Sequence, residues 1–210
     1  MNESQPTPSL AEQSAVASPP ESPESGIKHP QLIFGALLDE YKVLKDEQSS
    51  RIGFRDNLLY VTLSAMGAIF AFVAANPDYK DALLVVPWAS VILGWTYVVN
   101  DHHISQLGLY VRSDLRAQLQ KLLGMPTPIA LFGWEEFHRA DQTRVRRKQF
   151  QLLVDLLTFI FSGVAAIGVF VFGSSIVNAF ESTIIVIESV MLLILAGAIG
   201  YYSDWGRSRN

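Results

Sequence analysis

Four blocks of the sequence are almost entirely hydrophobic, and polar residues separate them. The first two blocks, residues 57–77 and 82–100, contain no formal charge, and residues 151–173 and 182–202 contain one carboxylate each. At a rise of about 1.5 Å per helical residue, each block can cross a hydrocarbon core of about 30 Å. The pattern therefore predicts an all-α protein, a four-span transmembrane helical bundle.

Short connections join these blocks in pairs. Residues 76–81 separate the first two blocks and residues 174–181 the last two, so we expect two antiparallel helical hairpins. A soluble four-helix bundle is the rival interpretation, but a helix that faces water needs a polar stripe with a period of 3.6 residues. Residues 162–172 and 184–194 are apolar almost all the way round. This favours the membrane.

Residues 30–56 predict an amphipathic cytoplasmic helix that runs into the first span. Long or apolar side chains recur there every three or four positions, which is the period of one helix face. They are Leu37, Tyr41, Leu44, Gln48 and Ile52. The stripe is narrow, as expected for a helix that packs against one or two neighbours.

A cytoplasmic helical linker is predicted for residues 101–149. Its first part carries a similar stripe, formed by Ile104, Leu107, Val111, Leu115, Gln118 and Leu122. We expect this helix to end near Gly124, because Pro126 and Pro128 lack a backbone donor and disfavour α geometry in the preceding residue. A further segment from Trp134 then leads into the third span.

Residues 1–27 are rich in Ser, Pro, Glu and Gln and contain no aromatic or basic side chain. Such a segment cannot bury enough apolar surface to fold, so we predict a disordered N-terminal tail. It lacks the basic and apolar regions of a secretory signal. Residues 203–210 are predicted to form a short cytoplasmic tail.

The basic residues predict the orientation. Of the 16 Lys and Arg residues, all except Lys80 lie before the first span, between the second and third, or after the fourth. By the positive-inside rule, both termini and the linker face the cytoplasm, in a bacterial inner membrane. The basic residues next to the spans are expected to bind anionic lipid headgroups. They are Arg51, Arg55, Arg144, Arg146, Arg147, Lys148, Arg207 and Arg209.

Asp155 and Glu188 are the carboxylates inside the spans, and burying an ionisable group in a membrane is costly enough to make each a functional candidate. Helical rise places Asp155 about 6 Å inside the cytoplasmic edge and Glu188 about 10 Å inside the outer edge. We therefore do not expect them to share a proton. Asp155 can reach headgroups or pair with Arg147 or Lys148, whereas Glu188 has no basic residue at its level, which favours a pore or inter-subunit role.

Several kinds of chemistry find no support in the sequence. Without cysteine there is no disulfide, thiolate or Cys-ligated metal site. His102 and His103 are adjacent and so point in different directions on a helix, unlike a zinc pair one turn apart. No nucleotide-binding or serine-hydrolase motif is present. We expect no catalytic residue, cofactor or metal, and the net charge of −4 argues against nucleic acid as a partner.

One stretch resembles a group of small, mostly uncharacterised bacterial membrane proteins. It runs from Leu38-Asp39-Glu40-Tyr41-Lys42 through Arg51-Ile52-Gly53-Phe54-Arg55, continues into the two-span hairpin and ends at Gly133-Trp134-Glu135. The resemblance covers residues 37–135. Small proteins of this general shape include membrane effectors of bacterial defence. The resemblance therefore implies an oligomer that perturbs the membrane when it is signalled, although the second hairpin lies outside the pattern.

These observations favour a non-enzymatic, homo-oligomeric pore or membrane-perturbing assembly controlled by its cytoplasmic helices. The alternative is a membrane anchor or scaffold that recruits a soluble partner through residues 30–56 and 101–149. A small transporter is a third possibility, but it would need broken helices in matching spans. Two pairs of small residues stand four positions apart, Gly67 with Ala71 on the first span and Ala196 with Gly200 on the fourth. This spacing lets helix backbones approach closely.

Overall fold

The computed structural model describes residues 29–124, 131–133, 143–174 and 176–202. This part of the chain is helical and contains no strand. Four of its helical segments are long and apolar enough to cross a membrane, which confirms the all-α class and the four apolar spans. The predicted tails, residues 1–27 and 203–210, and most of the segment from Trp134 lie outside the described residues.

The first segment is one uninterrupted helix, α1 (Pro30–Ala75). Pro30 occupies its first turn, where a missing backbone N–H costs nothing. At the other end the side chain of Asn76 donates to the carbonyl of Phe72 at 2.9 Å, and Pro77 follows. The predicted amphipathic helix and the first span are therefore a single rod.

The second segment is also continuous, from Pro77 to Leu122. It comprises a 3₁₀ helix, η1 (Pro77–Leu84), then α2 (Val85–Tyr110), one turn of π-helix, η2 (Val111–Leu115), and α3 (Arg116–Leu122). Part of the predicted connection, residues 76–81, is thus helical. Pro77 begins it and Asp78 in its first turn faces the positive end of the helix dipole.

The third segment joins α5 (Arg144–Asp155), a π-helical stretch η3 (Leu156–Phe161) and α6 (Ser162–Gly173). The last helix is α7 (Ala179–Tyr202) and begins before Ser182, the residue expected to start it. The cause is a capping box. The backbone N–H of Asn178 donates to Glu181 Oε2 and the N–H of Glu181 to Asn178 Oδ1, both at 2.9 Å.

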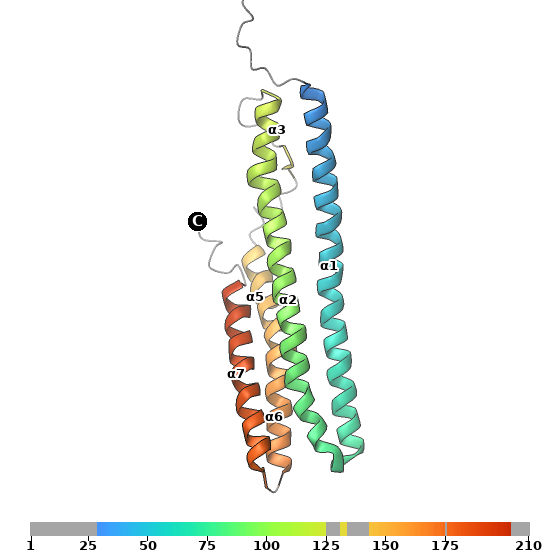
Figure 1. The fold of residues 1–210 in the computed structure, drawn as a ribbon, viewed down its shortest axis with the longest axis vertical. Coiled ribbons are helices and arrows are strands. Elements are labelled where there is room, and N and C mark those ends of the chain that lie inside the picture. The colour runs from blue at the N-terminus through green and yellow to red at the C-terminus, as the bar shows by residue number, and fades with distance from the viewer. Residues whose placement is uncertain (1–28, 125–130, 134–142, 175, 203–210) are drawn as a thin grey trace, which may run out of the picture.

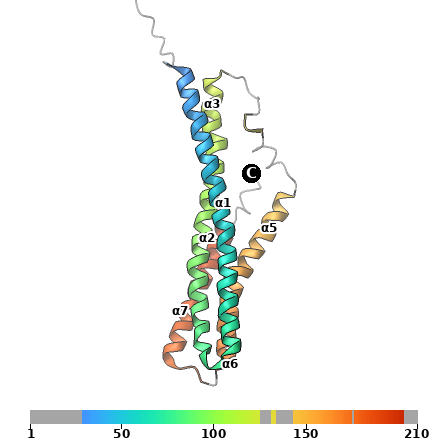
Figure 2. The ribbon, with the colours of Figure 1, turned by 90° about the vertical axis from the view of Figure 1, so that its right-hand side faces the viewer.

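α1 and α2 lie side by side and extend, with α3, well beyond the end of α7 (Figure 1). We call this projecting part, residues 30–56 and 101–122, the arm, and the remainder of the packed helices the bundle. The bundle thus has an arm end and, at the opposite side, a turn end that holds η1 and the α6–α7 connection. α7 packs chiefly against α2, and α5 leans away from the arm (Figure 2).

The arm has an apolar core of its own. Val111, Leu115 and Leu119 are buried in it, and partly buried side chains from α1, among them Phe34, Leu37, Tyr41 and Leu44, pack against them. The ring of Phe132 stacks on Tyr41 with 4.3 Å between centroids. Leu37, Tyr41 and Leu44 of the first predicted stripe thus pack with Val111 and Leu115 of the second, whereas the buried Leu119 was not part of it.

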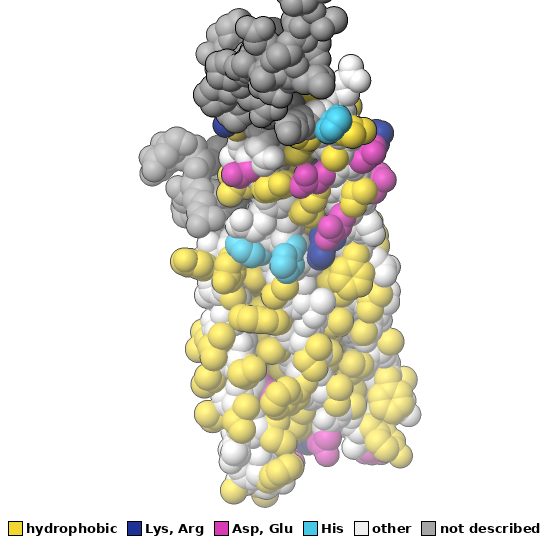
Figure 3. Space-filling view, turned by 45° about the horizontal axis from the view of Figure 1, so that its top comes forward, with side chains coloured by type: hydrophobic (Ala, Val, Ile, Leu, Met, Phe, Trp, Pro, Cys, Tyr) yellow, Lys and Arg dark blue, Asp and Glu magenta, His cyan; other side chains and the backbone are white. Residues whose placement is uncertain are grey.

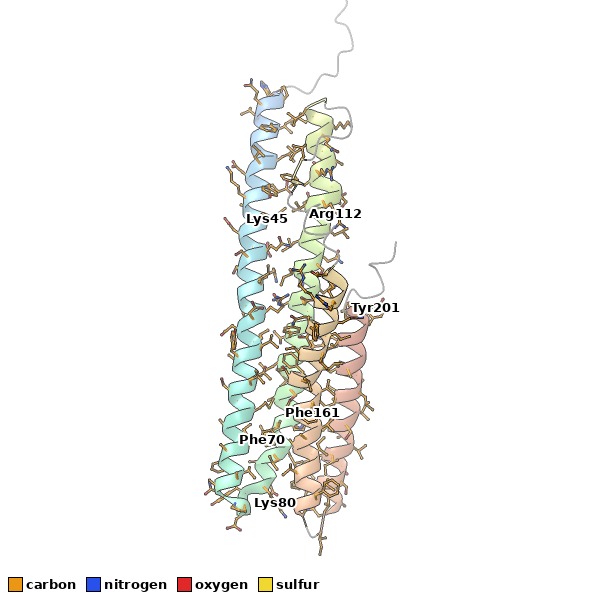
Figure 4. The ribbon with its side chains drawn as sticks, turned by 180° about the vertical axis from the view of Figure 1, so that it is seen from behind. Lys45, Phe70, Lys80, Arg112, Phe161 and Tyr201 are labelled. Atoms are coloured by element: carbon orange, nitrogen blue, oxygen red, sulfur yellow. The ribbon has the colours of Figure 1, made fainter. Side chains whose placement is uncertain are left out.

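The surface of the bundle is mostly hydrophobic, unlike that of a soluble protein. Large hydrophobic side chains such as Phe172, Phe180 and Leu193 are exposed, Phe172 by 94 %. In Figure 3 the bundle surface is mostly hydrophobic, while charged and histidine side chains gather on the arm and at the turn end. Figure 4 places Lys80 at the turn end and Lys45 and Arg112 on the arm. A hydrocarbon solvent suits such a surface.

Two glycines allow helices of the bundle to approach closely. A Cβ atom on Gly94 of α2 would lie 2.7 Å from Leu195 Cδ2, and one on Gly163 of α6 would lie 2.9 Å from Leu192 Cδ1. Gly67 and Gly200, which the small-residue spacing pointed to, have no such neighbour within 4 Å. Within this chain the close contacts therefore occur at other glycines than the sequence indicated.

We predict that Gly163→Leu destabilises the bundle by about 1–3 kcal/mol, because the new side chain meets Leu192 in a filled space. Unfolding of the purified protein in detergent measures this. Gly168→Leu is the matched control, since it adds the same residue to the same helix where nothing lies within 4 Å. Equal stability of the two variants would contradict the packing described here.

Candidate functional site

The bundle encloses polar side chains that are almost completely buried. They are Thr62, Ser90, Asn100, Asp155, Thr158 and Glu188, each at most 7 % exposed. Helices α1, α2, α5, α7 and the π-helical stretch η3 all contribute. Since polar groups are expensive to bury, their concentration inside an apolar shell makes this the candidate site.

Glu188 lies on the face of α7 that is turned into the bundle. Leu192, Leu195 and Ile199 continue this buried face toward the arm end. Glu188 is 1 % exposed, and neither oxygen of its carboxyl group has a hydrogen-bond partner. The indole of Trp88 is close enough to interact with the carboxyl group but does not reach normal hydrogen-bond geometry.

Glu188 lies in the middle part of α7. Because α7 begins at Ala179, helical rise places Glu188 about 14 Å from the turn end of this helix. The residue is buried within the bundle of one chain, and the inter-subunit role considered for it stays a prediction.

Asp155 lies at the end of α5 and faces α2. The amide of Gln151 donates to Asp155 Oδ1 at 2.9 Å and to the hydroxyl oxygen of Tyr97 at 2.7 Å. Tyr97 is close enough to interact with the carboxylate directly. The described partners of Asp155 are thus a tyrosine and a glutamine within the bundle.

A short hydrogen-bonded chain follows on the same face of the third segment. The hydroxyl of Ser162 donates to the carbonyl of Thr158 at 2.6 Å, and Ser90 Oγ lies 3.3 Å from Ser162 Oγ. Because the single proton of Ser162 is used, Ser90 donates in that contact. Asp155, Thr158 and Ser162 span η3, and π-helical turns frequently occur at functional sites.

The boundary between bundle and arm holds an ionic contact. Arg55 of α1 donates to Asp101 of α2 at 3.0 Å and also pairs with Asp56. The side chain of Asn100 donates to the carbonyl of Arg51 at 2.8 Å. Arg55, expected to bind headgroups, is thus a link between the two long helices, with only 22 % of its side chain exposed.

The other predicted basic residues lie on α1, on α5 and in the C-terminal segment. Arg51 pairs with Glu47 of its own helix at 2.7 Å, and Arg146 and Arg147 are exposed on α5, with Lys148 partly buried. The side chain of Arg144 lies outside the described part, as do Arg207 and Arg209.

Above the boundary, α1 and α2 enclose an open hollow of about 280 Å³. Its walls are Glu47, Arg51, His103, Gln106, Leu107 and Tyr110. The hydroxyl of Tyr110 donates to Glu40 at 2.8 Å, and this hydrogen bond raises the pKa of Tyr110. His102 contacts the ring of Tyr202, which brings the end of α7 to the base of the arm. No group of three metal-ligating residues occurs among the described side chains.

Sequence reasoning found the two carboxylates but missed what surrounds them. Gln151 and Asp155 are four apart on one helix, which is a readable signal for a side-chain contact. Tyr97, by contrast, was not singled out by the sequence. Its role depends on the packing of α2 against the third segment, which no local pattern reveals.

Comparison with known proteins adds no relative. No protein-family model matches this chain, and neither a curated protein nor a solved structure matches it at a significant level. Function must therefore be argued from the geometry of the bundle and the arm.

We predict that Arg55 and Asp101 are coupled by about 1 kcal/mol, because their contact is partly shielded from water. A double-mutant cycle with Arg55→Gln and Asp101→Asn, followed by unfolding in detergent, measures this. The control cycle uses Arg51→Gln and Glu47→Gln, which pair within one exposed turn and should couple by less than about 0.5 kcal/mol. A coupling at Arg55 no larger than the control would contradict a link between α1 and α2.

Proposed function

We propose that this chain is a non-enzymatic protein of the bacterial inner membrane that forms a homo-oligomeric pore or membrane-perturbing assembly, controlled by its arm. The single observation that carries the proposal is the continuity of α1 and α2. Each runs without a break from the arm into the bundle. A displacement of the arm is therefore transmitted to two of the four apolar helices.

The surface of the bundle supports the membrane part of the proposal. Its large exposed side chains are hydrophobic, and the two carboxyl groups within its apolar helices, Asp155 and Glu188, are buried. In water this distribution would be unfavourable, whereas in hydrocarbon it is the expected one. The four long apolar helices suit two antiparallel hairpins, and the arm end carries the basic residues that favour the cytoplasm.

The boundary contacts support the control part. Arg55 with Asp101, and Asn100 with the carbonyl of Arg51, fasten α1 to α2 at the level where the arm meets the bundle. Hydrogen bonds that involve charged groups are stronger and more directional than neutral ones. The two helices are therefore expected to move as a pair rather than to slide independently.

A membrane anchor or scaffold is the second candidate. The observation in its favour is the exposure of Leu32 and Val43 on the arm, where each is at least 65 % exposed although the arm is otherwise rich in charges. A soluble partner that covers these side chains would lower their free energy in water. Under this alternative, Leu32→Ser with Val43→Ser releases the partner from the membrane fraction and leaves the ion permeability of the membrane unchanged.

Restraining the arm tests the proposed pore. The chain has no cysteine, so cysteines can be introduced at will. We predict that Glu40→Cys with Tyr110→Cys, joined by a short bis-maleimide, changes the ion leak of proteoliposomes about tenfold or more, because it ties α1 to α2 where their side chains touch.

The matched control places the same linker on one helix only. Asp39→Cys with Lys42→Cys puts it on the exposed face of α1, where the native side chains pair three residues apart. This variant should leave the leak unchanged. If reconstituted protein gives no leak with either variant or before the reaction, the pore proposal is wrong and the anchor remains.

A further inference from the structure

We propose that Glu188 is a proton-binding site, that it carries a proton at neutral pH, and that it exchanges this proton with the arm side of the membrane. The proposal concerns the bundle of a single chain. It holds whether the protein conducts ions or only anchors a partner, because it needs neither an oligomer nor a pore.

The first argument is the isolation of the carboxyl group. Neither oxygen of Glu188 has a hydrogen-bond partner, although the residue is almost fully buried. An unpaired carboxylate in an apolar interior loses the solvation that stabilises its charge, and such a group becomes neutral instead. A neutral carboxyl group loses far less, so the structure is compatible with the protonated form.

The second argument is that no charged group faces Glu188 from any helix packed on α7. The third segment has no ionisable residue between Leu156 and Gly173, and on α2 the neighbour is Trp88, which does not titrate. Toward the arm end, the ionisable side chains buried in the bundle are those of Tyr97 and Asp155. Nothing therefore compensates a negative charge on Glu188.

The third argument is that buried polar side chains lie on the arm side of Glu188, although an apolar cluster with Phe159, Leu195 and Ile199 lies there too. Toward the turn end, Met66, Leu83, Val86, Ala166 and Phe170 form a buried apolar cluster, with Ile185 of α7 packed against it. This cluster closes the shorter route from Glu188 to the membrane surface. The side chains of this cluster are all apolar.

Toward the arm end the interior is polar on one face. Ser90 and Ser162 form a hydrogen-bonded pair, Thr158 follows, and Asp155 with Gln151 and Tyr97 lies beyond. Ser162 is one helical turn nearer the arm end than Ala166, which belongs to the apolar cluster. The hydroxyl pair thus begins where the cluster ends, and we call the series from Ser90 to Asp155 the polar line.

The direction of the hydrogen bonds fits this route. Because Ser162 donates to Thr158 and Ser90 donates to Ser162, the oxygen of Ser90 keeps its lone pairs free. It can accept a proton donor from the direction of Glu188. The hydrogen bond from Ser162 ends on the backbone carbonyl of Thr158, which cannot pass a proton on. Transfer beyond Ser162 therefore requires this hydroxyl to rotate toward a water molecule.

Carbodiimide labelling tests the proposal, because dicyclohexylcarbodiimide reacts with protonated carboxyl groups within membranes. The full-length chain is reconstituted into liposomes in one orientation, and labelled peptides are identified by mass spectrometry. We expect Glu188 to be labelled at neutral pH. Lowering the pH on the arm side from about 8 to about 6 should raise its rate of labelling several-fold, whereas the same change on the turn side should have no effect.

Variants separate the route from the site. Glu188→Gln abolishes labelling of this peptide, and Asp155→Asn leaves labelling of Glu188 in place. Ser90→Ala with Ser162→Ala slows the response to arm-side pH, while Ser64→Ala, an exposed serine of α1 outside the polar line, does not. Absence of labelling at every pH would overturn the proton site, and a response to the turn side would overturn the route.

Discussion

Because the exterior of the bundle is apolar, its polar groups must find their hydrogen-bond partners inside the bundle. This constraint explains most of the interior contacts. Backbone donors are satisfied by long unbroken helices, since water is absent from hydrocarbon. Side-chain hydroxyls are satisfied in the same way, as Thr62 donates to the carbonyl of Leu58 and Ser162 to that of Thr158. Asp155 obtains partners from two helices. Glu188 is the exception, because neither of its carboxyl oxygens has a hydrogen-bond partner.

The same constraint explains why the arm is built differently. Outside the apolar zone the helices α1 and α2 meet water, so they bury one stripe each and expose the rest. The link between Arg55 and Asp101 lies at the boundary between the bundle and the arm, where a charged pair can be partly shielded and still reach water. The arm and the bundle are thus two environments joined by continuous helices, and not two domains.

Much of the fold could be predicted because the membrane imposes simple patterns. Apolar blocks identified the four apolar helices, and several residues of the predicted stripes, among them Leu37, Leu44, Val111 and Leu115, pack in the core of the arm. The start of α7 was also readable, since Asn178 and Glu181 have the spacing of a capping box. Gly94, Gly163 and Tyr97 were not, because their roles depend on which helices touch and at what level.

The buried carboxyl group and the rigid arm have a physical connection. Ionising Glu188 requires water or a cation beside it, and the packed bundle provides neither in its described interior. A rearrangement of α2 or of its neighbours would admit them, and α2 is one of the two helices that continue into the arm. Under the proposed function, a displacement of the arm and proton binding at Glu188 would then act on one equilibrium, and each would bias the other by the same free energy.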